Sequence, residues 1–245
     1  MPRTLILVIV SFDKPVYYEM LRLWKQRNLQ NVWFIQCKPA SEWIGDIIND
    51  LPEQSQSQSR EQSLHLELDI QNQTLYVKGD ECLIPGILHK TVEALSFFLS
   101  TYPSIEYVWR TNLSSVVDVD RLEKYLDTIP STQFYGGYVG KAVNENIFFA
   151  SGAGFLMSRD VAEYLVANKA SLRYDLIDDV AIGALLEPRF GIVPIDRCWV
   201  QTGEEDIESE KVFHYRCESY MHARTIEFMQ YVSDRIIKQK RCFPY

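Results

Sequence analysis

The sequence lacks long hydrophobic runs, paired cysteines and an excess of positive charge. Its longest apolar run, 5–10, is far shorter than the roughly 20 residues of a membrane-spanning helix, and Asp13 and Lys14 interrupt it before any small-residue cleavage site. The five cysteines (37, 82, 198, 217 and 242) show no C-x-x-C spacing, which indicates reduced thiols and neither a disulfide framework nor a zinc site. The net charge of −8 argues against general affinity for nucleic acid or anionic membranes. These absences predict a cytoplasmic protein with no nucleic-acid partner and no membrane span.

Hydrophobic residues alternate between strand and helix patterns along the first half of the chain. Continuous apolar runs rich in β-branched residues predict buried strands, and apolar residues at helical spacing predict the helices between them. This alternation indicates an α/β fold with a parallel sheet and helices on both faces. The expected strands are 5–11, 31–37, 64–70, 74–79, 107–111, 133–139, 146–151 and 191–195, and the expected helices are 15–29, 121–127, 159–168, 179–186, 223–238 and one that begins near Pro85.

The second half mixes hairpins with helices, so we expect a sheet that is mostly parallel but mixed. A chain of 245 residues suits a single domain, 1–245. The polar, repetitive run EQSQSQSREQS at 53–63 predicts a mobile surface loop. In folds of this type, ligands bind at the carboxyl ends of the parallel strands.

Three segments carry the residues that suggest chemistry. They are RTNLSSVVDVD at 110–120, FFASGAGFLMSRDVAEYL at 148–165, and YDLIDDVAIGALL at 174–186, the last followed by FHYRC at 213–217. The small residues of 151–154, SGAG, let a ligand approach the backbone closely, and they equally suit a tight strand-to-helix turn. Asp178 and Asp179 precede a helix, where an N-cap is a common role for one carboxylate and leaves the second unexplained.

In this order and spacing the segments resemble GT-A-fold glycosyltransferases of the β-1,3-galactosyl/N-acetylglucosaminyl type, which include the Fringe enzymes. Those enzymes show a strand ending in Lys-x-Asp-Asp-Asp and a Ser-Gly-Gly/Ala-Gly-aromatic-x-x-Ser-Arg segment. A [Glu/Asp]-Asp-Val-x-x-Gly helix start and a late Phe-His follow. The match spans 106–215. The resemblance implies a single GT-A-like domain with a nucleotide-binding half at 1–111 and an acceptor-binding, catalytic half at 112–245.

The resemblance also implies an inverting transfer of a sugar from a nucleoside-diphosphate donor, with UDP by analogy, to a hydroxyl of a glycan acceptor. Asp179 would deprotonate that hydroxyl, and Asp178 would cap the helix and orient its neighbour. The residues expected to contact the transferred sugar or the acceptor are Ser151, Gly152, Ala153 and Gly154. The nucleotide would lie at the end of the first strand, around Ser11, Phe12 and Asp13.

The metal-binding turn of that family is altered in this sequence. Aligned on the strand, Lys-x-Asp-Asp-Asp falls on Arg110-Thr111-Asn112-Leu113-Ser114. Because Mg²⁺ and Mn²⁺ favour carboxylate and water oxygens, this turn should bind them poorly. We therefore expect Asn112 and Ser114 to contact the nucleotide without a tightly bound cofactor. A displaced Mn²⁺ or Mg²⁺ site at Asp118, Asp120 and His214 stays open, beside the interpretation of the two aspartates as a loop acid and an N-cap.

Without a metal, cationic side chains would balance the negative charge of the departing diphosphate. The candidates are Lys90, Arg216 and a protonated His214, with Arg110 a weaker candidate because it lies inside a strand. Lys90 also suits a solvated helix face, and a lone histidine is commonly structural.

Two other classes of protein stay open. A sugar-1-phosphate nucleotidylyltransferase would share the architecture, but its chemistry usually needs a glycine-rich phosphate loop after the first strand, and SFDKPVYYEM contains no glycine. A catalytically inactive glycan- or nucleotide-sugar-binding protein would account for the missing Asp-x-Asp.

Overall fold

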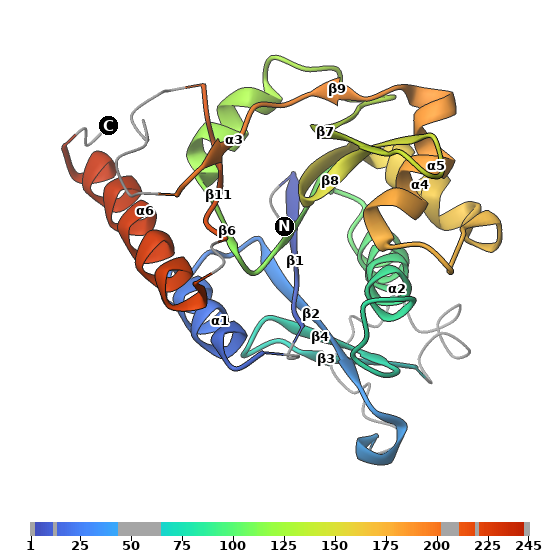
Figure 1. The fold of residues 1–245 in the computed structure, drawn as a ribbon, viewed down its shortest axis with the longest axis horizontal. Helices are drawn as coiled ribbons and strands as arrows, with labels where there is room; N and C mark the ends of the chain where they lie inside the picture. The colour runs from blue at the N-terminus through green and yellow to red at the C-terminus, as the bar shows by residue number, and fades with distance from the viewer. Residues whose placement is uncertain (1–2, 12–13, 44–64, 202–210, 219–220, 243–245) are drawn as a thin grey trace.

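The structure is a computed structural model that describes residues 3–11, 14–43, 65–201, 211–218 and 221–242. Eight strands form its main sheet, in the order β3-β4-β2-β1-β5-β8-β7-β9 (Figure 1). Neighbours among β4, β2, β1 and β5 are parallel, whereas β3 and β8 run antiparallel to theirs, so the sheet is mixed as predicted. The strands are β1 (Thr4–Ile9), β2 (Val32–Lys38), β3 (Leu66–Asp69), β4 (Thr74–Lys78), β5 (Tyr107–Asn112), β7 (Tyr135–Ala142), β8 (Ile147–Ser158) and β9 (Val193–Pro194).

Helices cover both faces of this sheet, as the alternating pattern predicts. Successive side chains of a strand point to opposite faces, and Leu5 and Leu7 accordingly join one hydrophobic cluster while Ile6 and Val8 join the other. The first cluster is covered by α2 (Gly86–Thr101), α4 (Arg159–Ala167) and α5 (Asp178–Phe190). The second is covered by α1 (Val16–Gln26), α3 (Val119–Leu126) and α6 (His222–Cys242), with α1 and α6 side by side (Figure 1).

A second, three-stranded sheet brings distant parts of the chain together. It consists of β6 (Ser115–Val117), β10 (Cys198–Trp199) and β11 (His214–Arg216). β6 follows β5 after the two-residue turn Leu113–Ser114, and Val116 pairs with Tyr215 of β11. The Cys217 amide also donates a hydrogen bond of 2.9 Å to the Ser114 carbonyl. The strand that carries Arg216 therefore lies beside the end of β5.

The register of the main sheet gathers the segments singled out in the sequence. β1 and β5 run parallel and end together, with Ile9 opposite Asn112. β8 returns antiparallel along β5, which places Gly154 opposite Thr111. Because β8 continues from there toward its beginning at Ile147, the backbone of 151–153 lies next to the end of β5.

Three local predictions need correction. The strand predicted at 146–151 continues to Ser158, so the SGAG segment lies within β8 and forms no turn. The N-cap of α3 is Asp118, whose carboxylate accepts a hydrogen bond of 3.3 Å from the Arg121 amide, and Asp120 lies in the first turn. The N-cap of α5 is Ile177, so Asp178 is already the first helical residue.

Other local predictions are confirmed. The strands predicted at 64–70 and 74–79 are present as the antiparallel pair β3 and β4, and the helix predicted near Pro85 begins at Gly86. The loop predicted at 53–63 lies outside the described residues. None of the helices that the structure describes is long and apolar enough to cross a membrane.

Candidate functional site

A pocket of about 570 Å³ lies at the carboxyl ends of β1 and β5. Its lining also includes residues of β8, the start of α5 and the small sheet, so all three motif segments contribute to it. The sequence-predicted residues that line it are Ser11, Arg110, Asn112, Leu113, Ser114, Ser151, Gly152, Ala153, Asp178, Asp179 and Arg216. Phe12 and Asp13 lie outside the described residues.

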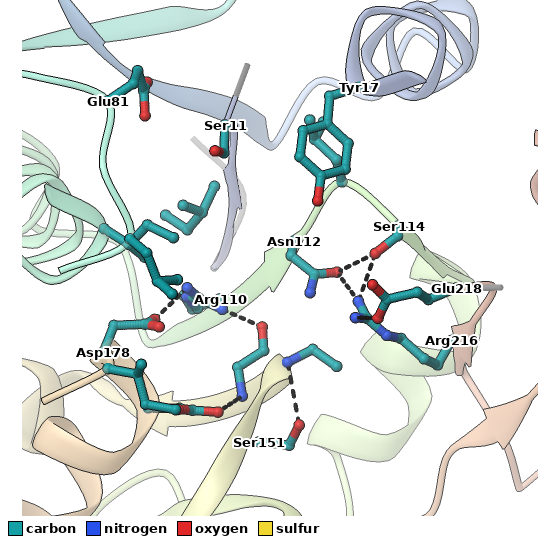
Figure 2. Close-up of a pocket in the computed structure, with 18 of the residues that line it drawn as sticks. Ser11, Tyr17, Glu81, Arg110, Asn112, Ser114, Ser151, Asp178, Arg216 and Glu218 are labelled. Atoms are coloured by element: carbon teal, nitrogen blue, oxygen red, sulfur yellow. Dashed lines mark hydrogen bonds and ion pairs between the residues drawn. The ribbon is translucent and has the colours of Figure 1, made fainter. Parts of the chain in front are cut away.

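One side of the pocket is a buried network around Arg110. Its guanidinium forms an ion pair with Asp178 and donates to the Gly152 carbonyl (Figure 2). The amide of the same Gly152 donates a hydrogen bond of 2.8 Å to the Asp179 carboxylate. The arginine of β5, the backbone of β8 and the first turn of α5 are thereby fixed relative to one another. Asp178 therefore pairs with Arg110, whereas the sequence predicted that it would cap the helix.

Asp179 is half-buried and lines this pocket. Burial raises the pKa of Asp179, and the negative charge of the neighbouring Asp178 raises it further. The Gly152 amide and Arg110 oppose this shift in the pKa. A carboxylate with a raised pKa is a stronger base, and this one is also oriented by a backbone amide. The arrangement can therefore accept a proton from a hydroxyl bound in the pocket.

The opposite side of the pocket is built on the turn after β5. One terminal nitrogen of Arg216 donates hydrogen bonds of 2.6 Å to Asn112 Oδ1 and 2.6 Å to Ser114 Oγ. Its other terminal nitrogen is paired with Glu218 (Figure 2). Ser115 Oγ donates to the same Asn112 oxygen at 3.0 Å. The turn that replaces the aspartates of the resembling family is thus organised around a guanidinium.

A second arginine, Arg197, lines the pocket and was not predicted from the sequence. Its guanidinium lies 3.9 Å from the ring centroid of Tyr138 and 5.1 Å from that of Trp199. It donates a hydrogen bond of 3.2 Å to Ser151 Oγ. Burial lowers the pKa of Arg197, and the charge of Arg216 lowers it further. Arg197 lies in an irregular segment before the two-residue strand β10 and belongs to none of the three motif segments. No pattern in the sequence therefore indicated it.

Lys90 does not line the pocket, which corrects two expectations for it. The side chain is fully buried and forms no solvated helix face. Its ammonium group donates to Glu81 at 2.5 Å and to the Val10 carbonyl at 2.5 Å. Glu81 does line the pocket and also accepts a hydrogen bond of 2.6 Å from the Cys37 amide. Lys90 therefore anchors the pocket wall from behind.

His214 and Gly154 also lie behind the pocket. Burial, followed by the charges of Arg197 and Arg216, lowers the pKa of His214 to about 3, so its ring is neutral near pH 7 and carries no cation for a diphosphate. A Cβ at Gly154 would lie 2.5 Å from Trp109 and 2.7 Å from His214. Gly154 is therefore small because it packs against these two rings, which corrects the expectation that it lies under a sugar.

Thr111 is likewise buried, and its side chain forms a hydrogen bond with the backbone. Its hydroxyl donates a hydrogen bond of 2.6 Å to the Ala153 carbonyl and thereby ties β5 to β8. Leu113 accepts a hydrogen bond of 3.1 Å from the Trp24 indole through its own carbonyl. Both contacts hold the backbone at the end of β5, where Asn112 and Ser114 project from it.

The side chains around the turn after β5 are arranged as acceptors for Arg216 and not as ligands of a divalent cation. Asn112, Ser114 and Glu218 all accept from Arg216, whereas Mg²⁺ needs a shell of oxygens about 2.0–2.1 Å from its centre. Asp118 is buried as the cap of α3, forms an ion pair with Arg121 and does not line the pocket, nor does Asp120. Within the described residues, no group of three or more His, Cys, Asp or Glu is arranged to hold a metal ion.

Comparison with known proteins gave structural matches only. No protein-family model and no curated protein matches the sequence. A glycosyltransferase involved in the glycosylation of the major capsid of PBCV-1 aligns with a TM-score of 0.50 and 12% identity, over 94% of this chain and 99% of that one. The chain shares the fold of a glycosyltransferase. Mouse xyloside xylosyltransferase 1, in its apo form, aligns over 88% of this chain and 96% of its own, with 11% identity and a TM-score of 0.39.

Proposed function

We propose that this chain is an inverting glycosyltransferase that moves a sugar from a nucleoside-diphosphate donor to a hydroxyl of a glycan acceptor. The observation that carries the proposal is Asp179, which lines a pocket at the carboxyl ends of β1 and β5 and has a raised pKa. The fold shared with the PBCV-1 enzyme supports it. UDP is the proposed nucleotide because of the resemblance to β-1,3-glycosyltransferases.

In this proposal Asp179 takes the proton of the acceptor hydroxyl. The hydroxyl oxygen forms a bond to the anomeric carbon while the bond from that carbon to the diphosphate oxygen breaks on the opposite side. The Gly152 amide, at 2.8 Å, holds the carboxylate in position. Asp178 keeps its charge paired with Arg110 and makes its neighbour more basic. Asp178 thus acts as a positioning residue.

Both substrates are proposed to bind in this pocket. Ser11 and Asn112 lie at the ends of adjacent parallel strands, where nucleotides bind in doubly wound folds. Ser151, Gly152 and Ala153 line the pocket from β8, next to Asp179, and are the proposed contacts of the transferred sugar or the acceptor. In this proposal the bond to be broken lies between the strand ends and the start of α5.

The proposal is tested by release of free nucleoside diphosphate from a panel of nucleotide sugars, with and without glycan acceptors. A positioned general base contributes about 10²- to 10⁴-fold in rate, so Asp179→Asn should lose turnover on that order while donor affinity stays nearly unchanged. Full turnover by Asp179→Asn would refute the assignment of the base. Donor binding by the unmodified chain with no turnover on any acceptor would instead indicate a nucleotide-sugar-binding protein.

A further inference from the structure

Two guanidinium groups line one side of the pocket. Arg216 reaches it from β11 and contacts Asn112 and Ser114, both at 2.6 Å. Arg197 reaches it from the segment before β10 and contacts Ser151 at 3.2 Å. Arg216 lies on β11 and Arg197 directly precedes β10. The small sheet pairs Trp199 of β10 with Arg216, which brings the two arginines close together.

The position of Arg216 matters because of the oxygens that surround it. Asn112 ends β5 and Ser114 lies in the turn after it, where the resembling family places its aspartates. The side-chain oxygens of both residues accept hydrogen bonds from one guanidinium nitrogen. A metal ion and this guanidinium cannot share those two oxygens. The site is therefore built around a permanent, covalently attached cation, since arginine stays protonated throughout the physiological pH range.

Arg197 adds a second positive charge, and no carboxylate among the described residues forms an ion pair with it. In the part of the chain that the structure describes, its polar contact is the uncharged Ser151 hydroxyl, and the charged group that acts on it is Arg216, which repels it. The Arg197 guanidinium also lies over the rings of Tyr138 and Trp199, where cation–π contacts stabilise its position. Its remaining N–H groups suit an anion, and a fork of donors matches phosphate oxygens well.

We propose that Arg197 and Arg216 together bind the diphosphate of the donor and stabilise it as the leaving group, in place of a divalent cation. The proposal rests on the function proposed above. As the bond to the anomeric carbon breaks, negative charge develops on the diphosphate next to two fixed positive charges, which need no rearrangement at that moment. Glu218 competes for Arg216 in the free protein, and its side chain is 42% exposed, so a phosphate group can displace it.

The binding test is calorimetric titration of the full chain with inorganic pyrophosphate and, separately, with UDP. Each titration is run in excess EDTA and again with Mn²⁺. We expect both ligands to bind in excess EDTA, because the cations belong to the chain. Binding that appears only with Mn²⁺ would overturn the proposal.

Variants assign the binding to the two arginines. Hydrogen bonds to charged groups imply that Arg197→Gln and Arg216→Gln each weaken pyrophosphate binding about 10- to 100-fold. Glu218→Gln should tighten it by removing the competing carboxylate. Arg189→Gln is the matched control, because Arg189 also stacks on aromatic rings but lies on α5 outside the pocket. Unchanged affinity in both arginine variants would overturn the proposal. If Arg216→Gln misfolds, Arg197→Gln still tests it, because this substitution leaves the contacts between Arg216 and Asn112 intact.

Turnover separates this inference from the function on which it rests. Sugar transfer that EDTA abolishes and Mn²⁺ restores would refute the proposal that the two arginines replace a divalent cation. The same result would support the proposed glycosyltransferase function. Tight pyrophosphate binding in EDTA, lost in the arginine variants but with no transfer from any donor, would support the arginine site and refute the transferase.

Discussion

Gly152 and Gly154 lie two residues apart on β8 and are small for different reasons. A Cβ at Gly154 would lie 2.5 Å from Trp109, inside the core. A Cβ at Gly152 would lie 2.9 Å from an Arg110 nitrogen and 3.2 Å from an Asp179 oxygen, at the pocket. The sequence motif groups the two residues, and the structure separates them into a packing position and a site position.

Alanine at the two positions should therefore have different effects. Overpacking a core costs about 1–3 kcal/mol, so Gly154→Ala should lower the free energy of unfolding by that amount in urea titrations. Gly152→Ala should displace Asp179 or Arg110, and misplacement of catalytic groups costs on the order of 10²-fold in rate. Equal losses of stability with no difference in turnover would contradict this division.

Asp179 should set the acidic limb of the pH–rate profile. A general base works only when deprotonated, so kcat/KM falls as the pH drops through its pKa. Because burial and Asp178 raise this pKa, the fall should occur at a higher pH than for an ordinary aspartate, whose pKa is about 3.9. Asp178→Asn removes one cause and should move the limb to lower pH. A limb that stays in place would show that Asp178 does not act on Asp179.

At the scale of single elements, α3 depends on Asp118. Its carboxylate caps the helix through the Arg121 amide and pairs with the Arg121 side chain at 3.5 Å. Loss of an N-cap costs about 0.5–2 kcal/mol, so Asp118→Ala should lower the free energy of unfolding within that range. Asp120 lies in the first turn, where a carboxylate contributes about 0.3–1 kcal/mol through the helix dipole. An unchanged free energy of unfolding in Asp118→Ala would contradict the assignment of the cap.

The long elements followed from the sequence because their patterns are local. Buried runs identified β1 and β2, and helical spacing identified α2. The strands of the small sheet were harder, since β6 and β10 have three and two residues and owe their pairing to β11. Arg197 was not predicted as a pocket residue for the same reason, because its position depends on that pairing. Lys90 was misjudged because burial of a lysine depends on a distant partner, Glu81.

At the scale of the whole molecule, the neutral His214 should make the fold sensitive to acid. Its pKa is about 3 in the folded chain against an ordinary 6.5, so the unfolded chain binds the extra proton first. This contribution to stability is complete above pH 6.5 and is lost as the pH falls toward 3. The loss amounts to at most about 1.4 kcal/mol per pH unit.

His214→Phe should remove this component, because phenylalanine cannot be protonated and its ring can pack against Trp109. Urea titrations between neutral and acidic pH would give the free energy of unfolding for both proteins, whatever the effect of the substitution at neutral pH. The difference between the two proteins should shift in favour of the variant as the pH falls. Parallel curves would show that His214 does not titrate differently on unfolding.

The spread of the pocket along the chain, from Ile9 to Glu218, has a consequence for protein synthesis. The chain emerges from the ribosome with its N-terminus first. The last strand of the main sheet along the chain is β9, which ends at Pro194, so the strands of this sheet emerge before Arg197 and Arg216. A product whose translation stops at residue 195 would contain every strand segment of the main sheet but neither Arg197 nor Arg216. It would also lack β11 and α6, whose buried side chains belong to the hydrophobic cluster on one face of that sheet. Premature termination there would therefore remove the proposed diphosphate site together with part of the cover of that face.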